Sequence, residues 1–144
     1  MNNDLMFSSK KDDWTTPKAL FDELNAEFHF TVDLCADDSN HLYVKYYTKE
    51  NNGLDAILTG ERVFCNCPYG KKSTSEWIRK CATCDAELVV LLIPARTDTI
   101  AFHEYIYHKA EIRFIKGRLK FGGAKNPAPF PSMLCIWRND NGNK

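Results

Sequence analysis

The chain has 144 residues, of which 44% are hydrophobic and 26% charged, a composition typical of globular proteins. Its formal net charge is zero, which argues against a module that binds nucleic acid mainly through overall charge. The chain contains no apolar run of about eighteen residues, and its first residues lack the pattern of a signal peptide. We expect one compact cytoplasmic domain over residues 12–138, with flexible ends at 1–11 and 139–144.

The first patterned segment begins at Thr16-Pro17. Thr16 is a residue type that caps helices, and proline is favoured at the first helical position, so Pro17 predicts a helix start. Apolar residues then recur at helical spacing, at Leu20, Phe21, Leu24 and Phe28. This start can be purely structural, or the helix N-terminus can also bind a carboxylate.

The next apolar segment, residues 30–36, predicts a strand that ends in a polar, acidic loop. Asp33 lies near its carboxyl end, where open α/β sheets bind ligands, and can face an ammonium group there. An ordinary turn-forming acidic loop is the alternative. A second short strand is expected over residues 44–48.

The central motif, Asn66-Cys67-Pro68-Tyr69, follows the apolar run 63–65 and precedes a predicted helix over residues 73–84. An asparagine side-chain oxygen and the next backbone carbonyl can both accept hydrogen bonds from one exocyclic amino group. Tyr69 can stack on the base that carries that group. The alternative is a plain strand-to-helix turn, because Asn and Pro are common turn residues.

Residues 86–94 form a continuous aliphatic run, which predicts a central strand buried on both faces. A helix is predicted over residues 100–108 with Asp98 as its cap, which leaves Arg96 available to meet a phosphate or a base. Strands are predicted over residues 110–116 and 132–138.

Between the last two predicted strands lie a basic segment with Arg118 and Lys120 and a proline-rich loop with Phe130. Together with Lys71 and Arg96, they predict a nucleic-acid surface. The alternative is a structural edge with solvated lysines. Overall, the alternation of helices and strands predicts an α/β fold with a mostly parallel sheet flanked by helices.

The six cysteines include two close pairs, Cys65-x-Cys67 and Cys81-x-x-Cys84, so a four-thiolate zinc site is one interpretation. Buried thiols in a reducing cytoplasm are the preferred interpretation, and we expect no metal.

The motifs, in their order along the chain, resemble those of the phage-type DNA N6-adenine methyltransferases of the Dam group. The resemblance rests on Asp13-Trp14-x-Thr16-Pro17, Asp33-x-Cys35-Ala36, Asn66-x-Pro68-Tyr69-Gly70, Pro94-Ala95-Arg96-Thr97-Asp98-Thr99, Gly117-Arg118-Leu119-Lys120-Phe121 and Ala128-Pro129-Phe130-Pro131-Ser132. Three departures stand out. Cys67 replaces the second residue of the Asn-Pro-Pro-Tyr signature, no glycine-rich loop follows the first strand, and the connection after Asp33 is short.

The resemblance implies a Rossmann-like fold that uses S-adenosylmethionine, with double-stranded DNA as the partner and adenine as the target. It implies catalytic roles for Asn66, Cys67, Pro68 and Tyr69. It also implies cofactor contacts by Trp14, Thr16, Pro17, Asp33, Cys35 and Asp55, with Glu50 a further candidate for the ribose hydroxyls.

Three alternatives stay open at this point. The same tetrapeptide type serves enzymes that methylate RNA or protein glutamine. The chain can also be a catalytically inactive nucleic-acid-binding relative, or a zinc-stapled adaptor.

Overall fold

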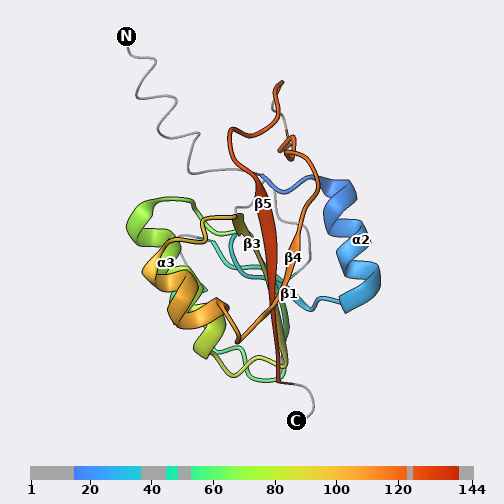
Figure 1. Cartoon of the computed structure of the whole chain (residues 1–144). Helices are drawn as coiled ribbons and strands as arrows, with labels where there is room; N and C mark the ends of the chain where they lie inside the picture. Colours follow the sequence, from blue (N-terminus) through green and yellow to red (C-terminus); the bar gives the residue numbers. More distant parts are fainter. Residues whose placement is uncertain (1–14, 37–44, 49–52, 123–124, 140–144) are drawn as a thin grey trace.

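The computed structural model describes residues 15–36, 45–48, 53–122 and 125–139. Its centre is a five-stranded sheet with helices on both faces (Figure 1). Helix α2 (Lys18–Phe28) covers one face, while α3 (Lys71–Thr83) and the π-helix η2 (Phe102–Ile106) pack together on the other. A short 3₁₀ helix, η1 (Gly53–Asp55), also contacts α3.

The sheet is mixed, so the prediction of a mostly parallel sheet is wrong for half of its pairings. The strands lie in the order β1-β2-β3-β5-β4, and they are β1 (Val32–Asp33), β2 (Arg62–Cys65), β3 (Leu88–Pro94), β4 (Glu111–Phe114) and β5 (Ser132–Arg138). The first three pair in parallel, whereas β5 is antiparallel to both β3 and β4. Parallel neighbouring strands need a crossover connection, which is usually a helix. Residues 115–122 and 125–131, between β4 and β5, contain no helix, in keeping with the antiparallel pairing of these two strands.

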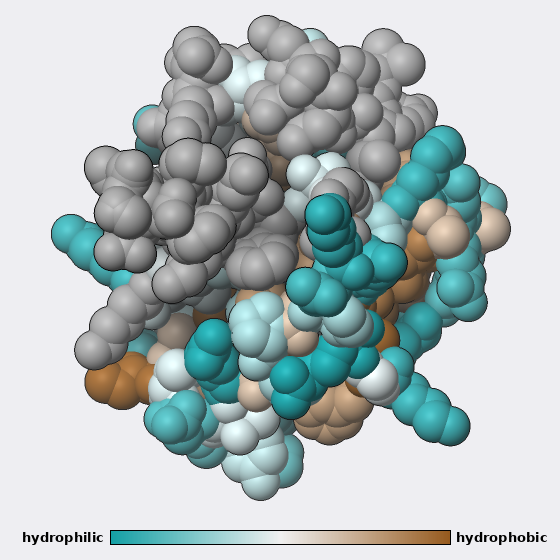
Figure 2. All heavy atoms as spheres, turned by 90° about the horizontal axis from the view of Figure 1, so that it is seen from above, coloured by the Kyte–Doolittle hydropathy of each residue, from teal (hydrophilic) through white to brown (hydrophobic). Residues whose placement is uncertain are grey.

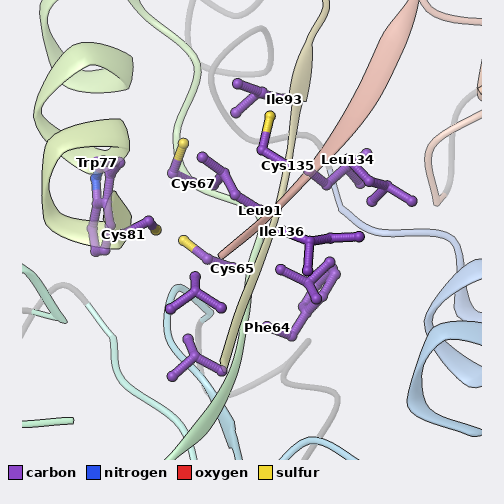
Figure 3. Packing of buried hydrophobic residues seen from close by; sticks show 14 of the residues in the cluster. Phe64, Cys65, Cys67, Trp77, Cys81, Leu91, Ile93, Leu134, Cys135 and Ile136 are labelled. Atoms are coloured by element: carbon purple, nitrogen blue, oxygen red, sulfur yellow. The ribbon is translucent and has the colours of Figure 1, made fainter. Parts of the chain in front are cut away.

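The core is divided between the two faces of the sheet (Figure 3). Cys65, Leu91 and Cys135 are register neighbours on the face covered by α3. On the opposite face, Phe64 packs edge-on against Phe21 of α2, with 5.3 Å between the ring centroids. The strands β2, β3 and β5 are therefore buried on both sides, and for β3 this confirms the prediction from the aliphatic run at residues 86–94.

Several predicted elements differ from the structure at their ends. The strand predicted over residues 30–36 is regular only at Val32–Asp33. Of the strand predicted over 44–48, the described residues 45–48 form a parallel bridge between Tyr46 and Asp33. The helix predicted over 100–108 winds as a π-helix because the Tyr107 N–H donates to the carbonyl of Phe102, five residues earlier.

The cap of this helical segment also differs from the prediction. The hydroxyl of Thr99, not the side chain of Asp98, accepts a hydrogen bond of 3.1 Å from the Phe102 N–H. No helix in the described residues is both long enough and apolar enough to cross a membrane. Asn139, which we assigned to the tail, hydrogen-bonds to the carbonyls of Glu87 and Ala86.

Candidate active site

The central motif lies at the edge of the sheet where β1, β2, β3 and β4 end, here called the carboxyl edge, at the upper end of Figure 1. Asn66 follows β2 directly, and α3 begins five residues later at Lys71. Thr74 stabilises the turn, because its hydroxyl accepts a hydrogen bond of 2.9 Å from the Gly70 N–H. The predicted strand, turn and helix are therefore confirmed.

The Asn66 amide is held at both ends by hydroxyl groups. Its Nδ2 donates to Oγ1 of Thr16 at 2.8 Å, and its Oδ1 accepts from the hydroxyl of Tyr69 at 2.6 Å. The Tyr69 oxygen also lies 3.1 Å from the carbonyl oxygen of Leu92 in β3. The motif thus joins β2, β3 and the start of α2 at one point.

The contact with Asn66 overturns the prediction that Thr16 caps α2. Pro17 is the N-cap residue, and within the described residues no side-chain cap hydrogen bond forms at this helix start. The Thr16 hydroxyl is buried and turned to Asn66 instead. The backbone N–H groups of the first turn of α2 are therefore without a side-chain cap in this part of the structure.

Tyr69 is only 7% exposed and lies in an aromatic cluster with Phe121 and Phe130. Its ring meets theirs edge-on, with centroid separations of 6.3 Å and 5.7 Å. Burial raises the pKa of the Tyr69 hydroxyl well above 10, and the nearby thiols of Cys67, Cys65 and Cys35 raise it further. The hydroxyl is therefore a hydrogen-bond donor at neutral pH.

The segment before α2 also contacts the basic segment that follows β4. The Gly122 N–H donates to the carbonyl of Thr15 at 2.9 Å. The residue after Thr15 is Thr16, which accepts the hydrogen bond from Asn66. Segments far apart in the sequence thus meet next to Asn66.

Two predicted cofactor residues lie at the end of β1. Asp33 is 3% exposed and pairs in register with Phe64 of β2. Cys35 is partly buried two residues later. Asp55 ends η1, which contacts α3 and whose first residue, Gly53, approaches Leu34, the residue that follows β1. Trp14 and Glu50 lie outside the described residues.

These positions fit the polar end of S-adenosylmethionine. The start of α2 offers uncapped backbone N–H groups, which suit a carboxylate. Asp33 supplies a buried carboxylate at the carboxyl edge, which suits an ammonium group. Both are located where ligands bind in open α/β sheets.

The predicted DNA contacts divide into exposed and buried residues. Arg96, Arg118 and Lys120 are exposed, and Figure 2, which looks down on this end, shows mainly hydrophilic side chains on the described surface. Phe130 is buried beside Tyr69. The guanidinium carbon of Arg96 lies 5.9 Å from the centroid of the Phe130 ring. Lys71 is the first residue of α3, and the position of its side chain is not described.

The six cysteines, all within the described residues, form no disulfide. Burial raises the pKa of the Cys65 thiol well above its usual value, and contacts with the thiols of Cys67 and Cys81 raise it further. Among the described residues no group of three or more His, Cys, Asp or Glu side chains could hold a metal ion.

Two partners of Tyr69 were not predicted from the sequence. They are the ring of Phe121 and the carbonyl of Leu92. Phe121 did carry a signal, as the aromatic residue of a basic segment. The Leu92 carbonyl carried none, because its role depends on how β3 lies beside β2.

In a comparison with models of protein families, residues 5–143 match the family described as DNA N-6-adenine-methyltransferase (Dam). The match confirms the resemblance drawn from the motifs, and it includes every predicted site residue. A search of curated proteins found none that matches the chain.

Proposed function

This chain belongs to the DNA N-6-adenine-methyltransferase (Dam) family, and we propose that it transfers a methyl group from S-adenosylmethionine to N6 of adenine in double-stranded DNA. The observation that carries the proposal is the Asn66 amide, held at the end of β2 between two hydroxyl groups. A fixed amide oxygen beside a backbone carbonyl is a suitable acceptor pair for one amino group.

The target adenine is flipped out of the duplex, because N6 cannot be reached inside the base stack. Asn66 Oδ1 and the Cys67 carbonyl accept hydrogen bonds from N6, and this orients the nitrogen lone pair for an in-line attack on the methyl group. The bond from that methyl group to sulfur would break as the bond to N6 forms, and N6 would then lose one proton to water. Alignment of this kind supplies most of the rate enhancement. Because only 7% of Tyr69 is exposed, stacking of the base on its ring requires the side chains that cover it to move.

S-adenosylmethionine supplies an electrophilic methyl group on a positively charged sulfur. The start of α2 would hold its carboxylate, and Asp33 would hold its ammonium group. Tyr69 acts as a hydrogen-bond donor and a stacking surface rather than as a base, because its raised pKa keeps the hydroxyl protonated.

The zero net charge requires DNA binding to use a local surface. Arg96, Arg118 and Lys120 supply positive charge around the carboxyl edge, and such charges bind phosphates without regard to sequence.

The test is transfer of tritiated methyl groups from S-adenosylmethionine to unmethylated DNA, followed by digestion and separation of the nucleosides. We expect label in N6-methyladenine with the wild type and none with Asn66→Ala. Asn139→Ala is the matched control, since it also removes an asparagine hydrogen bond, but at the opposite end of β3. Near-normal transfer by Asn66→Ala contradicts the assignment of the site.

Label in RNA or protein instead of DNA preserves the chemistry and changes the substrate. Cofactor binding without any transfer favours an inactive nucleic-acid-binding relative.

A further inference from the structure

We propose that Thr16 is a positioning residue for the reaction, which fixes the Asn66 amide through its side-chain hydroxyl. This inference rests on the proposed function of Asn66. In this role the Thr16 side chain holds Asn66, whose oxygen accepts the hydrogen bond from the substrate amino group. The family resemblance instead implies a cofactor contact at this position.

The geometry around Asn66 supports this role. An asparagine amide rotates readily about its last side-chain bond, and its terminal torsion has broad minima. Here the 2.8 Å bond to Thr16 and the 2.6 Å bond from Tyr69 hold opposite ends of the amide, so its plane is fixed. An amide oxygen has two lone pairs, so Oδ1 has the capacity to accept from Tyr69 and from a substrate amino group.

Thr16 is itself held firmly. The carbonyl of the preceding residue, Thr15, accepts a hydrogen bond from Gly122, and the carbonyl of the following residue, Pro17, accepts one from Phe21 in α2. The side chain is 7% exposed, so its rotamer is restricted by packing. The hydroxyl therefore presents a fixed acceptor to Asn66.

The positioning role and the cofactor role use different atoms. A carboxylate bound at the start of α2 contacts backbone N–H groups, which a side-chain substitution leaves in place. The contact with Asn66 uses Oγ1 alone. Thr16→Val keeps the shape and the β-branch but removes that oxygen, while Thr16→Ser keeps the oxygen.

The experiment compares the wild type with Thr16→Val, Thr16→Ser and the control Thr83→Val. Thr83 is an exposed residue of α3 whose hydroxyl bonds to the carbonyl of Arg79. We measure kcat for transfer to DNA, the Kd of S-adenosylmethionine by calorimetry and the thermal midpoint. A misplaced reacting group costs up to about 100-fold in rate, so we expect kcat of Thr16→Val to fall by about 10- to 100-fold. We expect its cofactor Kd to stay within about threefold, and Thr16→Ser to retain most of the rate.

A second readout does not depend on turnover. The side-chain NH₂ signals of Asn66 in a ¹⁵N-labelled sample are identified by their loss in Asn66→Ala. We expect Thr16→Val to shift or broaden these signals and Thr16→Ser to leave them close to the wild type.

Unchanged NH₂ signals and an unchanged kcat in Thr16→Val overturn the positioning role. A loss confined to cofactor Kd overturns it in favour of cofactor binding. If the wild type itself makes no N6-methyladenine, the proposed function fails, and the NH₂ signals still decide whether Thr16 fixes the amide.

Discussion

Arg113 in β4 donates hydrogen bonds of 2.8 Å to both carboxylate oxygens of Glu27 in α2, a residue 86 positions earlier in the chain. Its Nε also donates to Glu111 at 2.7 Å, and its guanidinium carbon lies 5.2 Å from the centroid of the Phe28 ring. These contacts attach the helix that starts at the site to the edge strand of the sheet. Bidentate pairs of this kind are more specific in geometry than single ion pairs.

The first prediction follows from this pair. The side chains are partly exposed, so we expect Arg113→Met to lower the free energy of unfolding by only about 1 kcal/mol at pH 7. Hydrogen bonds from Arg113 hold the pKa of Glu27 below 4.5, and hydrogen bonds from Arg138 and Arg113 hold the pKa of Glu111 below it. A lowered carboxyl pKa stabilises the fold above the ordinary pKa, and this stabilisation is lost as pH falls through the lowered value.

The difference in unfolding free energy between wild type and Arg113→Met should therefore narrow below about pH 4.5, where these carboxylates begin to bind protons in the unfolded chain but stay ionised in the folded wild type. Urea unfolding at several pH values measures it, with the exposed Arg79→Met as the control. A difference in unfolding free energy that stays constant down to pH 3 contradicts the lowered pKa values of Glu27 and Glu111.

Gly53 gives the second prediction. A Cβ atom there would lie 2.5 Å from the carbonyl oxygen of Leu34 and 2.9 Å from the Trp77 ring. Gly53→Ala should therefore cost about 1–3 kcal/mol of unfolding free energy through overpacking. Gly122→Ala is the comparison, because Gly122 has no positive φ and the nearest atom to a Cβ there would be Cγ2 of Thr15 at 3.4 Å. We expect Gly122→Ala to cost less in urea unfolding, and equal losses argue against the close approach at Gly53.

Cys67 gives the third prediction. We propose that this position acts through its backbone carbonyl, so Cys67→Ala should keep the initial rate of methyl transfer within about threefold. Its side chain is buried, and the same change should cost about 1 kcal/mol of stability. A loss of rate as large as that of Asn66→Ala would show that the thiol itself takes part.

Tyr69 gives the fourth prediction. Tyr69→Phe keeps the ring and removes the hydrogen bond to Asn66, so we expect about a tenfold fall in kcat, with a much larger fall for Tyr69→Ala. Because the pKa of Tyr69 is raised well above 10, its absorbance near 295 nm should not titrate up to pH 10. Subtracting the titration curve of Tyr69→Phe from that of the wild type isolates the signal of Tyr69. Ionisation of Tyr69 below pH 10 contradicts the burial of its hydroxyl.

Lys120 gives the fifth prediction. We propose that it contacts a DNA phosphate, so Lys120→Ala should weaken binding uniformly across sequences and reduce the salt slope of log K by about one. The control is Lys109→Ala, because Lys109 precedes β4 at the other end of the sheet. Fluorescence anisotropy with labelled duplexes at several salt concentrations measures both variants. Equal slopes for the two exclude the contact.

The sequence predicts the site best where the signal is local. The turn from β2 into α3 depends on neighbouring residues of the Asn66-to-Tyr69 motif, and it was predicted correctly. The contact between Thr16 and Asn66 spans 50 positions, and a residue type that commonly caps helices gives no sign that its hydroxyl is used elsewhere.

The topology was predicted less well for the same reason. The apolar run at residues 132–138 predicts a strand, but its direction depends on how residues 115–131 return the chain to the sheet. Of the predicted site residues, Trp14 lies outside the described residues, and the cofactor contact of Asp55, at the end of η1, stays a prediction.

The position of β5 has a consequence for how the chain assembles. It comes last among the described strands, yet it lies between β3 and β4 and pairs with both. Until residues 132–138 have been synthesised, β3 and β4 each lack this partner, and their open edges are a hazard for aggregation. The sheet can therefore be completed only after residues 132–138 have been synthesised. A fragment that ends before residue 132 should need a separate peptide of β5 to become soluble and fully folded.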